Sequence, residues 1–154
     1  MKKRFIAIIV GLLTLIIIPL IACSQSGSGA QVQQQPVLRT SNLVNGTITV
    51  SSGSYYNATF SVIGAMTSCT LTGSFTASGG SGNDIIAVVL DDMAFTNWVN
   101  GHQVSTLYNS GQITTSNINV SISTPGTYHL VFSNKFSTFT SKQVSTSVNL
   151  NWYQ

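Results

Sequence analysis

Charged side chains are scarce in this chain of 154 residues, which has six lysines and arginines, three aspartates and no glutamate. Three of the basic residues stand at positions 2–4, and the aspartates match the other three one for one. These six residues are Arg39, Lys135, Lys142, Asp84, Asp91 and Asp92. Basic surfaces bind nucleic acids and anionic partners, so the balance of charge beyond residue 4 predicts no nucleic-acid partner.

Residues suited to catalysis are also few. Histidine occurs only at His102 and His129, and no Gly-x-Ser-x-Gly sequence marks a serine nucleophile. His129 alternates with Tyr128 and Leu130, so we expect its side chain to point outward or between sheets. The glycines at 79–82 lack the Gly-Lys-Ser/Thr of a phosphate loop. We therefore predict that the protein is not an enzyme and has no cofactor.

Asp91 and Asp92 form the one adjacent pair of carboxylates. With Asn97 or Asn100 they would offer oxygen ligands for Ca²⁺, but this cation takes six to eight oxygens, more than this segment supplies. Aspartate is also common at helix starts, which favours a capping or turn role for Asp92. No metal site is predicted, and Ca²⁺ binding here stays an alternative.

The beginning of the chain has the pattern of an export signal. The basic residues at 2–4 precede an apolar run that ends at Ala22. That run is close to the lower limit for crossing a bilayer, and Pro19 interrupts its end. The sequence Leu-Ile-Ala-Cys at 20–23 resembles the lipobox of bacterial lipoproteins. The resemblance implies that residues 1–22 are removed and that Cys23 carries fatty acyl chains such as palmitate.

With Cys23 acylated, Cys69 has no partner in the chain. An internal disulfide and a cysteine-based zinc site are then excluded. Cys69 alternates with Leu71 on one face of a predicted strand. Free cysteine is among the most buried residue types, so an inert buried thiol is expected rather than a reactive one.

The rest of the chain divides into a tether and one domain. Residues 23–40 are rich in serine, glutamine and glycine without periodicity, which predicts a flexible tether. Residues 41–154 have ordinary single-domain length and repeated apolar–polar alternation, typical of strands with one solvated face. The alternating segments are 56–62, 69–75, 118–122, 128–132 and 144–152. Short strands at this spacing predict an all-β fold, a single antiparallel β-sandwich of GOLD-like or jelly-roll-like type.

One strand differs from the others. Residues 85–90 are apolar on both faces, which predicts a central strand that is covered on both sides. Phe95, Trp98 and Val99 follow it with helical spacing, and we expect one helical turn here that plugs an end of the core.

The C-terminal quarter resembles a GOLD domain, the β-sandwich of Golgi cargo receptors and of some lipid-transfer proteins. The resemblance covers Gly-Thr-Tyr-His-Leu-Val-Phe-Ser-Asn at 126–134, Phe-Ser at 136–137 and Lys-Gln-Val at 142–144. It implies a sandwich fold and a tendency to bind proteins or lipid surfaces. The cargo receptors usually have a cysteine where this chain has Val131, and their coiled coil is missing, so their trafficking role is not carried over.

Four residues near this motif are candidate contacts with a partner: Phe136, Phe139, Lys135 and Lys142. They lie in or beside a short segment between predicted strands. Two interpretations stay open for the phenylalanines, a contact patch or a cover for the end of the core, and the usual burial of aromatic residues favours the cover. Asn134 is expected to cap the turn, because asparagine in turns bonds nearby backbone. Lys142 is expected to close the loop.

Together these features predict a membrane-anchored bacterial lipoprotein that displays a non-catalytic interaction module for a protein partner. It would lie in the cell envelope, on the outer face of the cytoplasmic membrane or on the outer membrane. A carbohydrate- or ion-binding module is the alternative, since Trp98 or Trp152 on a polar sandwich face would suit such a site.

Overall fold

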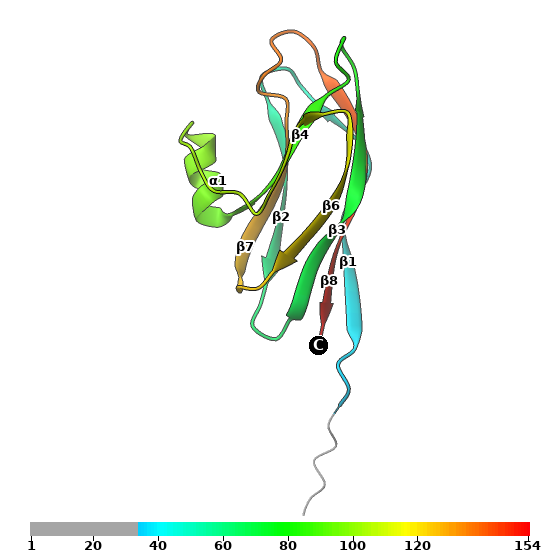
Figure 1. The fold of residues 1–154 in the computed structure, drawn as a ribbon, viewed down its shortest axis with the longest axis vertical. Helices are drawn as coiled ribbons and strands as arrows, with labels where there is room; N and C mark the ends of the chain where they lie inside the picture. The colour runs from blue at the N-terminus through cyan, green and yellow to red at the C-terminus, as the bar shows by residue number, and fades with distance from the viewer. Residues whose placement is uncertain (1–33) are drawn as a thin grey trace, which may run out of the picture. The chain divides into compact units, whose positions relative to one another are not determined.

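A computed structural model describes residues 34–154, which form eight β-strands and one α-helix (Figure 1). The strands are β1 (Leu38–Val50), β2 (Tyr55–Val62), β3 (Thr67–Ser78), β4 (Ile85–Asp91), β5 (Tyr108–Ile113), β6 (Thr115–Ile122), β7 (Gly126–Ser133) and β8 (Lys142–Tyr153). The helix α1 (Asp92–Val99) follows β4 directly. The predicted signal peptide 1–22 and the acylation site Cys23 lie outside the described residues.

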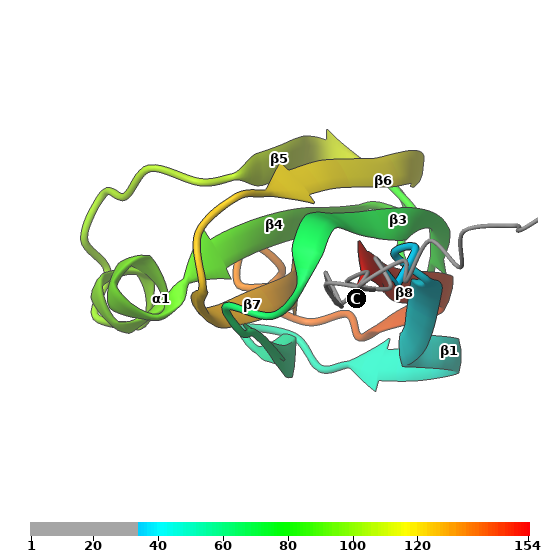
Figure 2. The same ribbon diagram turned by 90° about the horizontal axis from the view of Figure 1, so that it is seen from below.

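The eight strands make two antiparallel sheets that face each other. One sheet has the order β1-β8-β3-β6 and the other β2-β7-β4-β5 (Figures 1 and 2). Consecutive strands thus alternate between the sheets, except for β4 and β5, which pair within one sheet, and this is the winding of a jelly roll. The prediction of an antiparallel all-β sandwich is confirmed.

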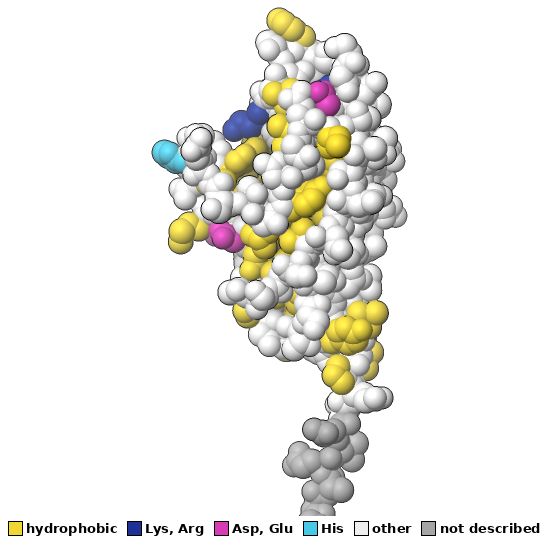
Figure 3. Space-filling model, viewed as in Figure 1, with side chains coloured by type: hydrophobic (Ala, Val, Ile, Leu, Met, Phe, Trp, Pro, Cys, Tyr) yellow, Lys and Arg dark blue, Asp and Glu magenta, His cyan; other side chains and the backbone are white. Residues whose placement is uncertain are grey.

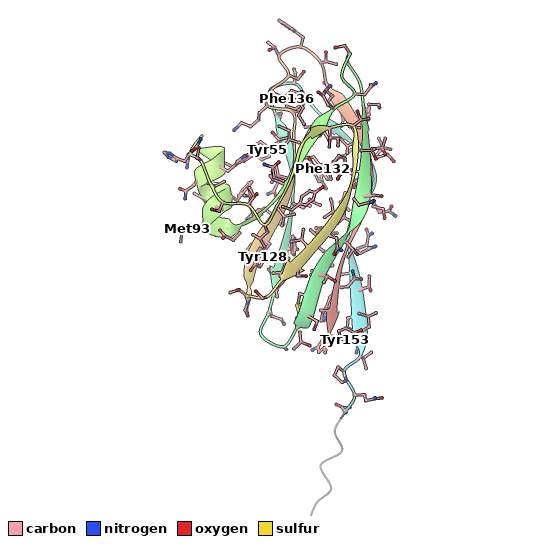
Figure 4. The ribbon with its side chains drawn as sticks, viewed as in Figure 1. Tyr55, Met93, Tyr128, Phe132, Phe136 and Tyr153 are labelled. Carbon is pink, nitrogen blue, oxygen red and sulfur yellow. The ribbon has the colours of Figure 1, made fainter. Side chains whose placement is uncertain are left out.

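The core lies between the sheets and is built by period-two alternation. In β8 the side chains of Val144, Thr146, Val148 and Leu150 are buried, while Ser145, Ser147 and Asn149 between them face outward. Phe75 and Phe132 meet edge to face across the core, with ring centroids 5.4 Å apart; Figure 4 shows Phe132 pointing inward. Burying side chains of this size contributes about 1.5–3 kcal/mol each.

The outer face of the β1-β8-β3-β6 sheet is almost entirely uncharged and polar. Register places serine, threonine, asparagine and glutamine of four strands on this face. Many of their side chains bond one another. Asn151, for example, accepts a hydrogen bond from the Thr40 hydroxyl at 2.9 Å and donates one to Thr72 at 2.9 Å. The side-chain polar groups of this sheet are therefore partly satisfied across the strands.

The opposite sheet carries a second, smaller core on its outer face. Val88, Leu90 and Val131 are buried there beneath Phe95 and Trp98 of α1. The prediction that β4 is covered on both faces is confirmed. The prediction that a helical turn plugs an end of the core is wrong. Instead, α1 lies against the outer face of the sheet that contains β7 and β4 (Figure 2). The apolar outer face of β4 requires that cover, because water would otherwise contact it.

The strand β1 begins earlier than the sequence predicted. It starts at Leu38, so residues 38–40 of the predicted tether pair with β8, and Val37 exchanges two backbone hydrogen bonds with Gln154. The end of this strand is polar, as a linker is, and for this reason the predicted tether extended to residue 40. Within 34–154, no helix has the length and apolar character needed to span a membrane.

Gly73 allows the close approach of β3 and β8. A Cβ atom at this position would overlap the Ser147 carbonyl oxygen and would lie 2.7 Å from the Val148 Cα.

We expect Gly73→Ala to lower the free energy of unfolding by about 1–3 kcal/mol, the usual cost of overpacking. Urea unfolding of the wild type and the variant would measure this difference in free energy. Gly64→Ala is the matched control, because a Cβ there meets nothing within 4 Å; equal stability of both variants would contradict the prediction.

Candidate functional site

The predicted contact residues gather at one end of the sandwich. Leu38 pairs with Tyr153 and Val50 pairs with Lys142, so β1 runs from the end where the described chain begins to the end that carries the β7–β8 loop. We call the latter the distal end; it is formed by the loops 51–54, 79–84 and 134–141. Figure 1 shows these loops together, opposite the C-terminus.

Asn134 joins two of the distal loops. Its buried side-chain amide donates hydrogen bonds to the carbonyl oxygens of Val50, Ser51 and Thr140, at 3.1, 3.2 and 2.9 Å. Its backbone N–H also donates to the Ser54 carbonyl at 2.9 Å. Asn134 therefore caps its own turn, as predicted, and also fastens the β1–β2 loop. Buried and saturated donors of this kind hold a loop in one conformation.

Lys142 fastens the third distal loop. Its ammonium group donates to the Gly79 carbonyl at 2.8 Å and to Asp84 Oδ1 at 2.7 Å, and the lysine is buried. Lys142 thus closes a loop, as predicted. Its proposed contact with a partner is corrected, because a charge that is buried and neutralised by Asp84 is not offered to a second molecule.

Asp84 is held in its ionised form by its neighbours. The Gln112 side chain donates to one carboxylate oxygen and Lys142 to the other, and these bonds lower the pKa of Asp84 from its ordinary value of 3.8. Gln112 belongs to β5, so this carboxylate connects the β3–β4 loop to both sheets.

The two phenylalanines of the β7–β8 loop differ in exposure. Phe139 is 93% exposed and Phe136 is 38% exposed. The Phe136 ring lies 5.8 Å from the Lys142 ammonium group, which gives it a structural contact. Figure 4 shows Phe136 at the distal end. The core-cover interpretation is wrong for Phe139, which stands in solvent on a fastened loop.

Lys135 is exposed beside these residues. Its ammonium group lies 4.6 Å from the centre of the Trp98 ring on α1. This cation–π contact connects the β7–β8 loop to the second core. Trp98 also packs edge to face on Tyr55, with centroids 5.2 Å apart. Neither Trp98 nor the half-buried Trp152 is an open aromatic platform of the kind proposed for a sugar.

His129 belongs to a network that the sequence did not reveal. It points outward from β7 beneath α1, where its ring stacks on Phe95 with centroids 4.0 Å apart. Its Nε2 lies 3.1 Å from the Asp92 carboxylate, and its Nδ1 lies 3.2 Å from Asn57 Oδ1 and 3.3 Å from the Thr59 hydroxyl. Asn57 and Thr59 share one ring nitrogen, so the arrangement holds the ring in place between β2 and α1.

The adjacent aspartates have separate structural roles. Asp91, rather than Asp92 as predicted, is the N-cap of α1: its carboxylate accepts the Ala94 backbone N–H at 2.7 Å. Asp92 contacts His129 instead. No group of three or more histidine, cysteine or acidic side chains within the described part of the chain is placed to hold a metal ion.

Two open grooves lie away from the distal end. One, of about 720 Å³, is bordered by Asp91, Met93, Leu107 and the β6–β7 loop. The other, of about 560 Å³, is lined by residues that include Val62, Met66 and Cys69. Cys69 is buried, as predicted, and its burial raises the pKa of the thiol. A raised pKa lowers the thiolate fraction and with it the reactivity.

No protein-family model matches the chain, and comparison with curated proteins finds no match. Any function assigned to it therefore rests on its own residues and their geometry.

The ion pair of Asp84 predicts a specific loss of stability in acid. Because the folded-state pKa lies below 3.8, ionised Asp84 stabilises the fold above that pH, and this contribution is lost as the pH falls through the folded-state pKa. We expect urea unfolding to show a decline in stability below about pH 4. Asp84→Asn should remove much of the decline, since Asp91 and Asp92 are the only other acidic side chains of the sequence. Asp92→Asn, at an exposed carboxylate, is the control that should retain it.

Proposed function

We propose that this protein is a bacterial envelope lipoprotein, anchored through acylated Cys23, whose jelly-roll domain is a non-catalytic module that binds a protein partner at its distal end. The observation that carries the proposal is Phe139, an aromatic side chain 93% exposed on a loop fastened by buried Asn134. A phenylalanine ring that is 93% exposed contributes little to the stability of the fold. It supplies a large apolar contact for another molecule instead.

The rigidity of the distal loops favours this use. Binding is weakened by the entropy lost when a loop is ordered, so a loop that is already ordered loses less. The Asn134 amide and the Ser137 hydroxyl both bond the Thr140 carbonyl, each at 2.9 Å. Phe139 lies between Ser137 and Thr140, so its backbone is held while its ring is free.

The position of the site also suits an anchored protein. Across the thirteen residues of β1, the distal end is about 40 Å from the end where the described chain begins. With an anchor at Cys23, the chain enters the domain from the membrane side. Two or three acyl chains give stable anchoring, at about 0.8 kcal/mol for each buried methylene.

The anchor is tested on the native protein. We expect mass spectrometry of the product purified from bacterial membranes to find Cys23 as the first residue, carrying a diacylglyceryl group. Cys23→Ser should abolish incorporation of labelled palmitate, because the serine hydroxyl is a far weaker nucleophile than the thiol. Cys69→Ser, at a buried thiol, is the control that keeps the label. An unmodified Cys23 or an intact leader would refute the anchor.

The contact is tested by photo-crosslinking in intact cells. A photoreactive phenylalanine analogue at position 139 should give one protein adduct. The same analogue at Met93, an exposed hydrophobic residue on α1, should not (Figure 4). Excess wild-type protein should compete for the adduct, and Phe139→Ser should not.

Stability is the control for this experiment. Phe139→Ser should change the free energy of unfolding by less than about 0.5 kcal/mol, as expected of an exposed site. Equal crosslinking at 139 and 93, or a large loss of stability in Phe139→Ser, would contradict the proposal.

A further inference from the structure

The end of the sandwich opposite the distal loops carries exposed hydrophobic side chains. We call it the proximal end and define it by Val37, Leu38, Ile63, Met66 and Tyr153. All but Met66 are exposed, and Met66 is partly buried against the core. Figure 3 shows hydrophobic side chains at this end, and Figure 4 places Tyr153 there.

These side chains come from three parts of the chain that pairing and hydrogen bonds bring to the same end of the sandwich. Leu38 of β1 pairs with Tyr153 of β8. The Thr67 hydroxyl donates to the Tyr153 carbonyl at 3.2 Å, which joins β8 to the β2–β3 turn. Within that turn the Met66 backbone N–H donates to the Ile63 carbonyl at 2.9 Å. The turn is therefore closed, and it holds Ile63 outward.

Met66 also lines the groove of about 560 Å³ between the β2–β3 and β6–β7 turns. Val62, Met66, Cys69, Ile122 and Pro125 are among its lining residues, and none of the residues that line it is charged. Apolar side chains thus lie both on the exposed proximal end and in the groove beside it.

Few charged side chains lie at this end. Lys142 and Asp84 lie at the distal end. Asp91 and Asp92 border the neighbouring groove beside the β6–β7 loop and do not line the apolar one. Arg39, next to Leu38 in β1, is exposed and pairs with Trp152. Exposed tyrosine and arginine next to apolar residues are typical of surfaces at a membrane–water boundary.

The length of the chain outside the structure indicates what covers this surface. Position 34, where the described residues begin, is eleven residues after Cys23. Eleven residues span at most about 40 Å. An acylated Cys23 therefore keeps the proximal end, where the chain enters β1, within about 40 Å of the bilayer. The local concentration of lipid at this surface is high without any further affinity.

We propose that the proximal end docks on the lipid surface, so that Ile63, Leu38 and Tyr153 enter the headgroup region and the distal loops point away from the membrane. This inference rests on the proposed anchor at Cys23. Docking orients the module, because a domain held by both a lipid and an apolar end does not tumble freely. Phe139 is then presented to partners outside the membrane rather than to lipid.

The test compares two isoleucines at opposite ends of the domain. Ile63 is 57% exposed at the proximal end, and Ile113 is 42% exposed where β5 ends, near the distal loops. Full-length acylated protein carrying Ile63→Cys or Ile113→Cys is labelled with an environment-sensitive dye and inserted in phosphatidylcholine vesicles. Acylation occupies the Cys23 thiol and Cys69 is buried, so the label goes to the introduced cysteine.

We expect a lipid-borne quencher to remove more than half of the fluorescence at position 63 and little at position 113. A second pair of variants carries the dye at Tyr153→Cys and differs in one further substitution. Adding Ile63→Ser should reduce the quenching at position 153 several-fold, whereas adding Ile113→Ser should leave that quenching unchanged. Thermal unfolding of each variant checks that it is folded.

The other possible results of this experiment each contradict docking of the proximal end on lipid. Protein that floats with the vesicles but is not quenched at position 63 is anchored and undocked, which leaves the proposed anchor intact. Equal quenching at both positions means free tumbling, and stronger quenching at position 113 means that the distal end enters the lipid. Protein that does not float with the vesicles refutes the anchor, and the docking with it.

Discussion

The register of β8 is the constraint on which the rest of the structure depends. This strand pairs with β1 on one side and with β3 on the other. Its inward residues fill the core, and a shift by one position would exchange them for the polar residues of the outer face. Its ends matter equally, since Lys142 starts the strand at the distal loops and Tyr153 ends it at the proximal end. One strand therefore sets the core and both candidate surfaces.

The small number of charged residues shapes how the surface is built. The outer face of the β1-β8-β3-β6 sheet uses hydroxyl and amide groups that bond one another, as between Asn42 and Asn149 at 3.0 Å. Such pairs stay hydrated and hold their strands together without ion pairs. The few charges left are used where loops must be fixed. Lys142 and Asp84 join the distal loops, and Asp92 positions His129 beneath α1.

The two ends of the sandwich differ in a way that suits an anchored module. At the distal end, buried polar groups hold the backbone and leave one aromatic ring in solvent. At the proximal end, exposed hydrophobic side chains lie near an uncharged groove. The same hydrophobic effect would act at both ends, on a protein partner in one case and on lipid in the other. The long β1 and β8 strands keep the two surfaces apart, so the proposed protein partner and the proposed lipid contact would not compete.

The sequence by itself determined the all-β class, the strands around Leu71, Val148 and Leu130, and the two-sided burial of β4, because period-two alternation and continuous apolar runs are local patterns. It also indicated Cys23 as an acylation site and Phe136 and Phe139 as candidate contacts. Only the tertiary structure decided that Phe139 is exposed while Lys142 is buried, and that α1 covers the outer face of β4. Those outcomes depend on contacts between residues far apart in the chain, such as Lys142 with Asp84 and Asn134 with Val50, and no local pattern encodes such pairings.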